Sequence, residues 1–146
     1  GSLESLTAEA LRRVKERHPD SLKESILAIC AWACAKADLR GCSGKLIEAI
    51  ADVACRSTAL WSDRHLTMIA WSVVVQGRYS KATAQFVRET YVRVVEHYVA
   101  SGPESVDEAL PHLDHLAVLS IALRVDPGLR CLSAPPAPPL PRSPAL

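Results

Sequence analysis

The chain has 146 residues, of which 49% are hydrophobic, and this composition excludes a disordered protein and predicts one core of ordinary size. Seventeen basic residues nearly balance sixteen acidic ones, and the net charge of +1 excludes an overall field that attracts nucleic acid or an anionic membrane. Five cysteines are an odd number, so we interpret them as free thiols in a reducing compartment. No apolar run reaches the roughly 18 residues of a membrane span, and we expect no membrane partner.

Proline divides the chain into a body and a tail. Six of the ten prolines lie within residues 135–144, and the tail sequence APPAPPLPRSPAL has too little apolar surface to fold alone. We therefore predict a helical-repeat domain over residues 1–132 and an extended, polyproline-like tail over residues 133–146.

The first half of the body predicts three helices, because its apolar residues recur at helical spacing and almost never alternate. The first is predicted over residues 7–18, with Thr7 as its cap and Pro19 as its end. The second begins at Ser21, which has the spacing of a capping box with Glu24, and runs to about residue 38. The third spans residues 43–56. The residues expected to face the core are Leu22, Ile26, Ile29 and Ala33 in the second helix and Leu46, Ile50, Val53 and Ala54 in the third.

The second half predicts four more helices. One begins near Ser62 and ends at Gly77, which favours a left-handed helix end; it is apolar all round, so we expect neighbours on more than one side. The next covers residues 80–100. A short helix from Ser105 is expected to stop at Pro111, and a last one covers residues 114–125. The buried face of the helix over 80–100 is predicted to consist of Val87, Tyr91, Val94, Val95 and Tyr98.

An internal repeat links three of these helices. Residues 26–33 align without a gap on residues 65–72 at an offset of 39, and residues 115–122 align at a further offset of 50. The first two copies share an Ala-Trp-small triplet around Trp32 and Trp71, and we expect both tryptophans to be buried between repeats. Chance similarity between two amphipathic helices is the alternative. The repeat predicts an all-α fold, an α-solenoid of about three antiparallel helical hairpins.

The repeat resembles the octotricopeptide and heptatricopeptide families, organellar helical-hairpin repeat proteins that often accompany a RAP domain. The similar segments are residues 31–36 (AWACAK) and 70–74 (AWSVV), within a likeness spanning residues 18–125. This chain departs from the pattern at Ser72, has Ile121 in place of a third tryptophan, and contains no RAP domain. The resemblance implies an RNA-binding or RNA-associated scaffold in an organelle.

Helical-repeat RNA binders need basic groups for the phosphates and flat side chains that stack on bases. Candidates of both kinds occur at predicted turns and helix starts, and we expect them at one end of the helical stack. An ordinary solvated rim is the alternative, because acidic residues are interspersed. The candidate RNA-binding residues are Lys23, Lys36, Arg40, Lys45, Arg64, Arg78, Tyr79 and Lys81.

The other chemical motifs do not form a recognisable site. Cys30, Cys34 and Cys42 lack the second pair that a zinc site requires, and an alanine-rich context favours core packing. The glycine-rich segment 41–45 lacks the spacing of a phosphate-binding loop, and no nucleophile motif such as G-x-S-x-G is present. We therefore predict no enzyme activity, cofactor, metal or small-molecule substrate.

These observations predict a non-catalytic helical-repeat RNA-binding or scaffold protein of an organellar ribonucleoprotein. We expect a mitochondrial ribosome subunit of the matrix that contacts ribosomal RNA and neighbouring subunits. Near-neutral charge favours a small subunit among proteins and RNA over an autonomous RNA binder. The alternative is a protein–protein adaptor α-solenoid without direct RNA contact, whose PxxP tail engages an aromatic groove.

Overall fold

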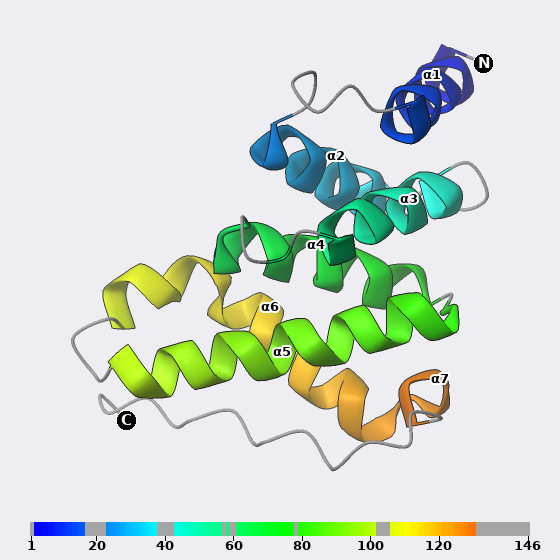
Figure 1. The fold of residues 1–146 in the computed structure, drawn as a ribbon. Coiled ribbons are helices and arrows are strands. Elements are labelled where there is room, and N and C mark those ends of the chain that lie inside the picture. The colour runs from blue at the N-terminus through cyan, green and yellow to red at the C-terminus, as the bar shows by residue number, and fades with distance from the viewer. Residues whose placement is uncertain are drawn as a thin grey trace.

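The computed structural model describes residues 2–16, 23–37, 43–56, 58, 61–77, 79–101 and 106–130. These residues form seven helices and no strand, which confirms the all-α class (Figure 1). The helices are α1 (Ser2–Glu16), α2 (Glu24–Lys36), α3 (Ser43–Arg56), α4 (Asp63–Gln76), α5 (Lys81–Ser101), α6 (Val106–Val125) and α7 (Pro127–Arg130).

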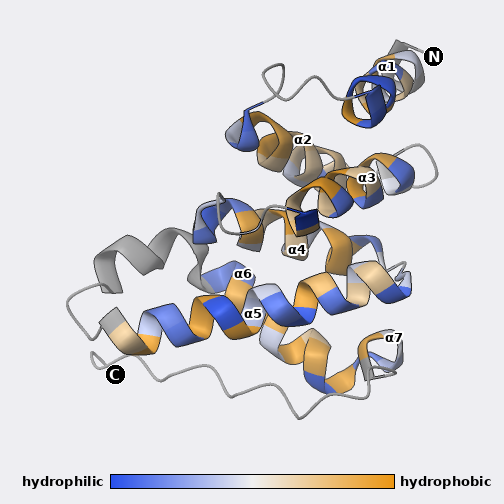
Figure 2. Cartoon of the chain, in the orientation of Figure 1, coloured by the Kyte–Doolittle hydropathy of each residue, from blue (hydrophilic) through white to orange (hydrophobic). Residues whose placement is uncertain are grey.

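The helices form two rows that alternate along the chain. In the even-numbered row, α4 packs against both α2 and α6; in the odd-numbered row, α3 contacts α1 and α5, and α5 contacts α7. From α2 onward each helix also packs against the next one in sequence, so the core lies between the rows. Figure 2 shows hydrophobic residues along α2 and the middle of α4, whereas α3 and α5 both alternate between hydrophobic and hydrophilic residues along their length.

The predictions for the middle of the chain are confirmed. Helix α3 has the expected bounds, and its four expected core residues are all buried. At the start of α4 the Ser62 hydroxyl accepts a hydrogen bond from the amide of His65 (3.2 Å), and at its end Gly77 has φ 68°. Helix α4 contacts α2, α3, α5 and α6, as its apolar sequence predicts. On α5, Val87, Tyr91, Val94 and Val95 are buried, and Tyr98 is partly buried.

The predicted starts of the first two helices are wrong. Helix α1 begins at Ser2, so Thr7 lies inside it, 8% exposed, and does not cap it. Helix α2 begins at Glu24, and the preceding Lys23 makes no side-chain cap; Ser21 lies outside the described residues. Good helix formers such as Leu3 and Glu4 extend α1 beyond Thr7, because a cap at Thr7 would contribute only about 0.5–2 kcal/mol.

The predicted inward face of α2 is also wrong. Ile26 and Ile29 are 47% and 55% exposed, and Ala33 is exposed, whereas the residues that face the core are Leu27, Ala28, Ala31 and Ala35. Apolar residues surround α2, so periodicity alone does not select a face. The alanines face the core because small side chains let α2 approach α4 closely.

One helix replaces the two that Pro111 was expected to separate. Helix α6 runs without interruption from Val106 to Val125. Pro111 lies in its second turn and removes only the hydrogen bond to the carbonyl of Asp107. Packing of the later part of α6 against α4 and α5 stabilises the helix beyond that point.

The three aligned segments bury equivalent positions. Leu27, Leu66 and Leu116 occupy the second aligned position and are 6%, 0% and 1% exposed. The sixth position holds Ala31, Ala70 and Ser120, which are also buried. Helices α2, α4 and α6 therefore bury the same side.

The tryptophans differ from the expectation. Trp32 and Trp71 are only partly buried, and Trp71 but not Trp32 packs against the core cluster. The buried tryptophan is Trp61, 4% exposed, in the connection between α3 and α4. Arg93 on α5 donates hydrogen bonds to the backbone oxygens of Thr58 and Trp61 and lies 3.4 Å from the carboxylate of Asp63. Trp61 and Arg93 thus hold the described residues of this connection in place.

Candidate nucleic-acid interface

The structure places the described candidate residues at two opposite ends of the helical stack. Lys36 ends α2, Lys45 lies in the first turn of α3 and Lys81 begins α5; Figure 1 shows these helix ends on one side of the molecule. Lys23 precedes α2 and Arg64 lies in the first turn of α4, on the other side. The expectation of a single basic end is therefore wrong, because helices of one row run parallel and have their starts together. Arg40 and Arg78 lie outside the described residues.

The end that carries three lysines, called here the lysine end, consists of Lys36, Lys45 and Lys81. All three side chains are exposed, and none of them forms an ion pair with a carboxylate among the residues that the structure describes. Their charges come from three different helices. This end therefore offers an anionic partner cations that no described carboxylate neutralises.

Tyr79, at the lysine end, is part of a structural contact. Its hydroxyl donates a hydrogen bond to Asp126 Oδ2 (2.9 Å), and its ring packs against the core cluster. Burial, followed by this hydrogen bond, raises the pKa of the Tyr79 phenol. The other carboxylate oxygen of Asp126 accepts a hydrogen bond from the amide of Gly128 (2.9 Å). Tyr79 thus joins the α4–α5 turn to the start of α7, a role that the sequence pattern did not indicate.

Replacing Gly128 with alanine tests this contact. An added Cβ at Gly128 would lie 2.6 Å from Tyr79 Cδ2, so we expect the variant to lose about 1–3 kcal/mol of unfolding free energy. In a Tyr79→Ala background the ring is absent, and the same substitution should cost much less. Urea unfolding of the four proteins of this double-mutant cycle measures the difference. Equal costs in both backgrounds would show that the ring does not restrict Gly128.

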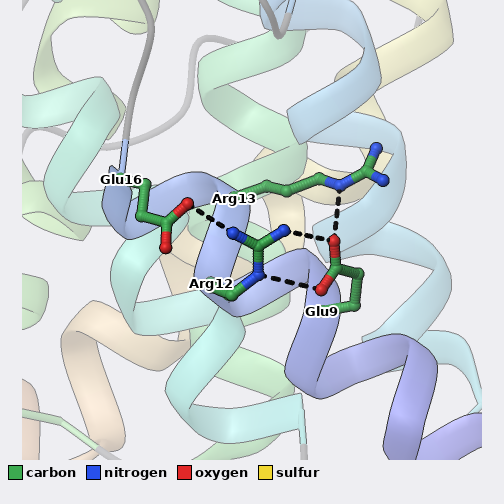
Figure 3. A network of polar contacts seen from close by, with 4 residues as sticks. All are labelled: Glu9, Arg12, Arg13 and Glu16. Carbon is green, nitrogen blue, oxygen red and sulfur yellow. Dashed lines mark hydrogen bonds and ion pairs between the residues drawn. The ribbon is translucent and has the colours of Figure 1, made fainter.

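Two arginines of α1, Arg12 and Arg13, pair with carboxylates of the same helix (Figure 3). Arg12 forms hydrogen bonds with Glu9 and Glu16, and Arg13 Nε lies 2.9 Å from Glu9 Oε1. Hydrogen bonds from Arg12 and then Arg13 lower the pKa of the Glu9 carboxyl to about 2. The four side chains are exposed, so these pairs add little to stability. They do, however, reduce the attraction of α1 for phosphate groups.

A second surface, called here the aromatic surface, consists of Trp32, Lys36, Trp71 and His115 on the three helices of the even-numbered row. The Lys36 ammonium lies 5.1 Å from the centroid of the Trp32 ring, and the ring centroids of Trp71 and His115 are 5.1 Å apart. Lys36 is also close enough to His115 to act on its charge. The sequence repeat identified the tryptophans but not the histidine, whose contact depends on how α6 packs against α4.

His115 is predicted to stay neutral below the pH at which an ordinary histidine gains a proton. Burial first, and then Lys36, lower its pKa, whereas Asp114 raises it. Its Nδ1 atom is buried and has no hydrogen-bond partner among the described residues. Because the unfolded chain binds this proton more readily, the stability that His115 contributes is present above about pH 6.5 and falls as the pH drops below it.

An NMR titration of the His115 ring measures this property directly. We expect a midpoint below that of an ordinary histidine. Lys36→Ala should move the midpoint up and Asp114→Asn should move it further down, since the first removes a repelling charge and the second an attracting one. A midpoint at or above about 6.5 in the native chain would contradict the burial of the ring.

A groove lies between α1, α3 and the start of α5, with Lys15, Lys45, Glu48, Asp52 and Arg56 among its lining residues. Arg56 donates a hydrogen bond to Asp52 (2.6 Å), and the remaining charges are of both signs. Mixed charge of this kind does not select an anionic or a cationic ligand. The groove therefore adds no specific chemistry to the site.

The cysteines and histidines of the described part do not assemble a metal site. No group of three or more His, Cys, Asp or Glu side chains capable of holding a metal is found there. Cys30, Cys34 and Cys55 are free thiols, and burial raises the pKa of each, which makes them less reactive. Cys42 lies outside the described residues. Among the helices that the structure describes, none is long and apolar enough to cross a membrane.

Comparisons with family models, with curated proteins and with solved structures gave no match. The arrangement of side chains is therefore the basis for the functional proposal.

Proposed function

We propose that this chain is a non-catalytic helical-repeat scaffold protein of an organellar ribonucleoprotein, a mitochondrial ribosome subunit that contacts ribosomal RNA and neighbouring protein subunits. The observation that carries the proposal is the equivalent burial of Leu27, Leu66 and Leu116 in three helices of one row. It supports an α-solenoid of about three antiparallel hairpins, in which each unit needs its neighbours to bury apolar surface. Such stacks present long surfaces for macromolecules.

The RNA contact is assigned to the lysine end, because Lys36, Lys45 and Lys81 are exposed there and no described carboxylate pairs with them. A lysine that neutralises a phosphate releases a condensed counterion, so RNA affinity falls as salt concentration rises. The resemblance of residues 31–36 and 70–74 to organellar repeat proteins supports the same partner. The mitochondrial matrix follows from that resemblance and agrees with the free thiols of Cys30, Cys34 and Cys55.

Binding of a fluorescent ribosomal RNA fragment, measured by anisotropy from about 50 to 200 mM salt, tests the RNA contact. We expect affinity to fall steeply with salt in the native chain. Combined Lys36→Ala, Lys45→Ala and Lys81→Ala should weaken binding and reduce the slope of log affinity against log salt by about 2–3.

Lys23→Ala with Arg64→Ala, at the opposite end, is the matched control and should leave the slope nearly unchanged. Loss of binding in both sets, or affinity that does not respond to salt, would argue against an RNA contact at the lysine end. Co-sedimentation of the native chain with mitochondrial ribosomal particles tests the setting. Its absence from these particles would contradict the ribosomal assignment.

A protein–protein adaptor without direct RNA contact is the second candidate, and one observation favours it. The outer side of the even-numbered row is apolar and exposed, with Ile29, Val75, Val118 and Val125 each between 37% and 62% exposed. Apolar area of this kind is typical of a surface that binds another protein. A partner bound there should keep its affinity as salt rises, which distinguishes the two candidates.

A further inference from the structure

The first helix of the even-numbered row has an uncovered side. Ile26, Cys30 and Ala33 are the first, fifth and eighth aligned positions and share one side of α2. Ile26 is 47% exposed, Cys30 is partly exposed and Ala33 is exposed. On α4 the residues that align with Cys30 and Ala33 are Ile69 and Ser72, and both are 0% exposed. On α6 the same positions are also buried, with Leu119 at 0% and Ala122 at 7%. This side, the upstream edge, is thus open only on α2.

The contact between Trp71 and His115 shows what normally covers such an edge. His115 is the first aligned position of α6 and Trp71 is the seventh of α4, and their ring centroids are 5.1 Å apart. The upstream edge of one helix therefore packs against the side of the preceding helix that carries the seventh position. We call that second side the downstream edge.

The last helix of the row has an uncovered downstream edge. Its residues are Ala117, Ile121 and Arg124, the third, seventh and tenth aligned positions. Ile121 is 55% exposed and Arg124 is exposed, whereas Ala28 and Ala35, which align with Ala117 and Arg124, are 0% and 3% exposed on α2. The even-numbered row therefore has an open upstream edge on α2 and an open downstream edge on α6. Edges of these two kinds pack against each other between neighbouring helices of the row.

We propose that a second copy of this chain covers these edges, with the upstream edge of α2 in one copy packed against the downstream edge of α6 in the other. The joint would continue a contact that occurs twice within each chain, between α2 and α4 and between α4 and α6. Such a head-to-tail contact is heterologous, so each added copy presents the same free edge again. The inference depends only on helix packing and not on RNA binding.

The chemistry of both edges suits this occupant. Ile26, Cys30 and Ala33 carry no charge, and the small side chains of Cys30 and Ala33 permit close helix packing. On α6 the Arg124 guanidinium is directed back to its own helix, with Nη2 3.3 Å from Ser120 Oγ, which leaves Ile121 as the exposed apolar centre. A net charge of +1 produces little repulsion between copies.

Sedimentation velocity at rising protein concentration tests the proposal. The native chain should form dimers and then larger species as concentration approaches about 200 µM. Ala33→Glu should block only the upstream edge and Ile121→Glu only the downstream edge, so each variant alone should remain monomeric. An equimolar mixture should form a one-to-one dimer and nothing larger, since each variant keeps the edge that the other has lost.

Leu6→Glu and Val99→Glu are the matched controls, because Leu6 and Val99 are 65% and 62% exposed on α1 and α5 of the odd-numbered row and belong to neither edge. They should associate as the native chain does. Circular dichroism confirms that all variants are folded. A native chain that stays monomeric at every concentration would overturn the proposal. The edges would then be covered by something other than a second copy, such as residues 131–146 or another protein. Dimers of Ile121→Glu alone would also overturn it, because they would indicate a symmetric α2–α2 contact.

Discussion

Replacing Leu66 with alanine is expected to lower the free energy of unfolding by about 2–5 kcal/mol. Leu66 is fully buried on α4, the central helix of the even-numbered row, which contacts four other helices. Removing its side chain leaves a cavity in the core around α4, which the surrounding helices fill only in part. Urea unfolding followed by circular dichroism measures the loss.

The aligned leucines provide an internal comparison. Leu116→Ala should cost a similar amount, whereas Val75→Ala, at a position that is 39% exposed on α4, should cost much less. Equal losses at Leu66 and Val75 would contradict the assignment of one buried side to the row.

Replacing Trp61 with alanine is expected to cost about 3–5 kcal/mol, a large fraction of the stability of an ordinary domain. Trp61 is 4% exposed, and its backbone oxygen accepts a hydrogen bond from Arg93. Loss of the ring removes the apolar anchor of the α3–α4 connection and leaves the hydrogen bonds from Arg93 to the backbone to hold it. Thermal and urea unfolding both report the effect.

Trp32→Ala is the control for size and aromatic chemistry. Trp32 is only partly buried and its ring faces the ammonium of Lys36, so we expect a smaller loss of unfolding free energy. If Trp32→Ala were the more damaging substitution, the buried position of Trp61 in the core would be wrong.

The sequence predicted the fold best where one residue acts on the backbone of its own neighbours in the chain. Ser62 and Gly77 marked both ends of α4 because a hydroxyl cap and a left-handed glycine act through neighbouring residues. The inward face of α2 was not predictable, since Ile26 and Leu27 are equally apolar and only the position of α4 decides between them. The uninterrupted α6 likewise depends on tertiary packing beyond Pro111.

The candidate interface was less predictable than the fold. The sequence places Lys36, Lys45 and Lys81 near helix ends, but the direction of each helix decides which of them lie together. Tyr79 is the sharper case, because its hydrogen bond joins residues 47 positions apart and no local pattern indicates it. A contact between two segments that are distant in the sequence cannot be predicted from the local pattern of either segment.

The alanines between α2 and the rest of the core determine which mutations this protein tolerates. Ala28, Ala31 and Ala35 are 0%, 0% and 3% exposed. Each has only a methyl group as its side chain, so a substitution by a smaller residue removes no more than that group. Any larger residue would instead force two backbones apart. Over evolutionary time, these three positions should keep alanine and reject valine and leucine, although these are the more hydrophobic residues.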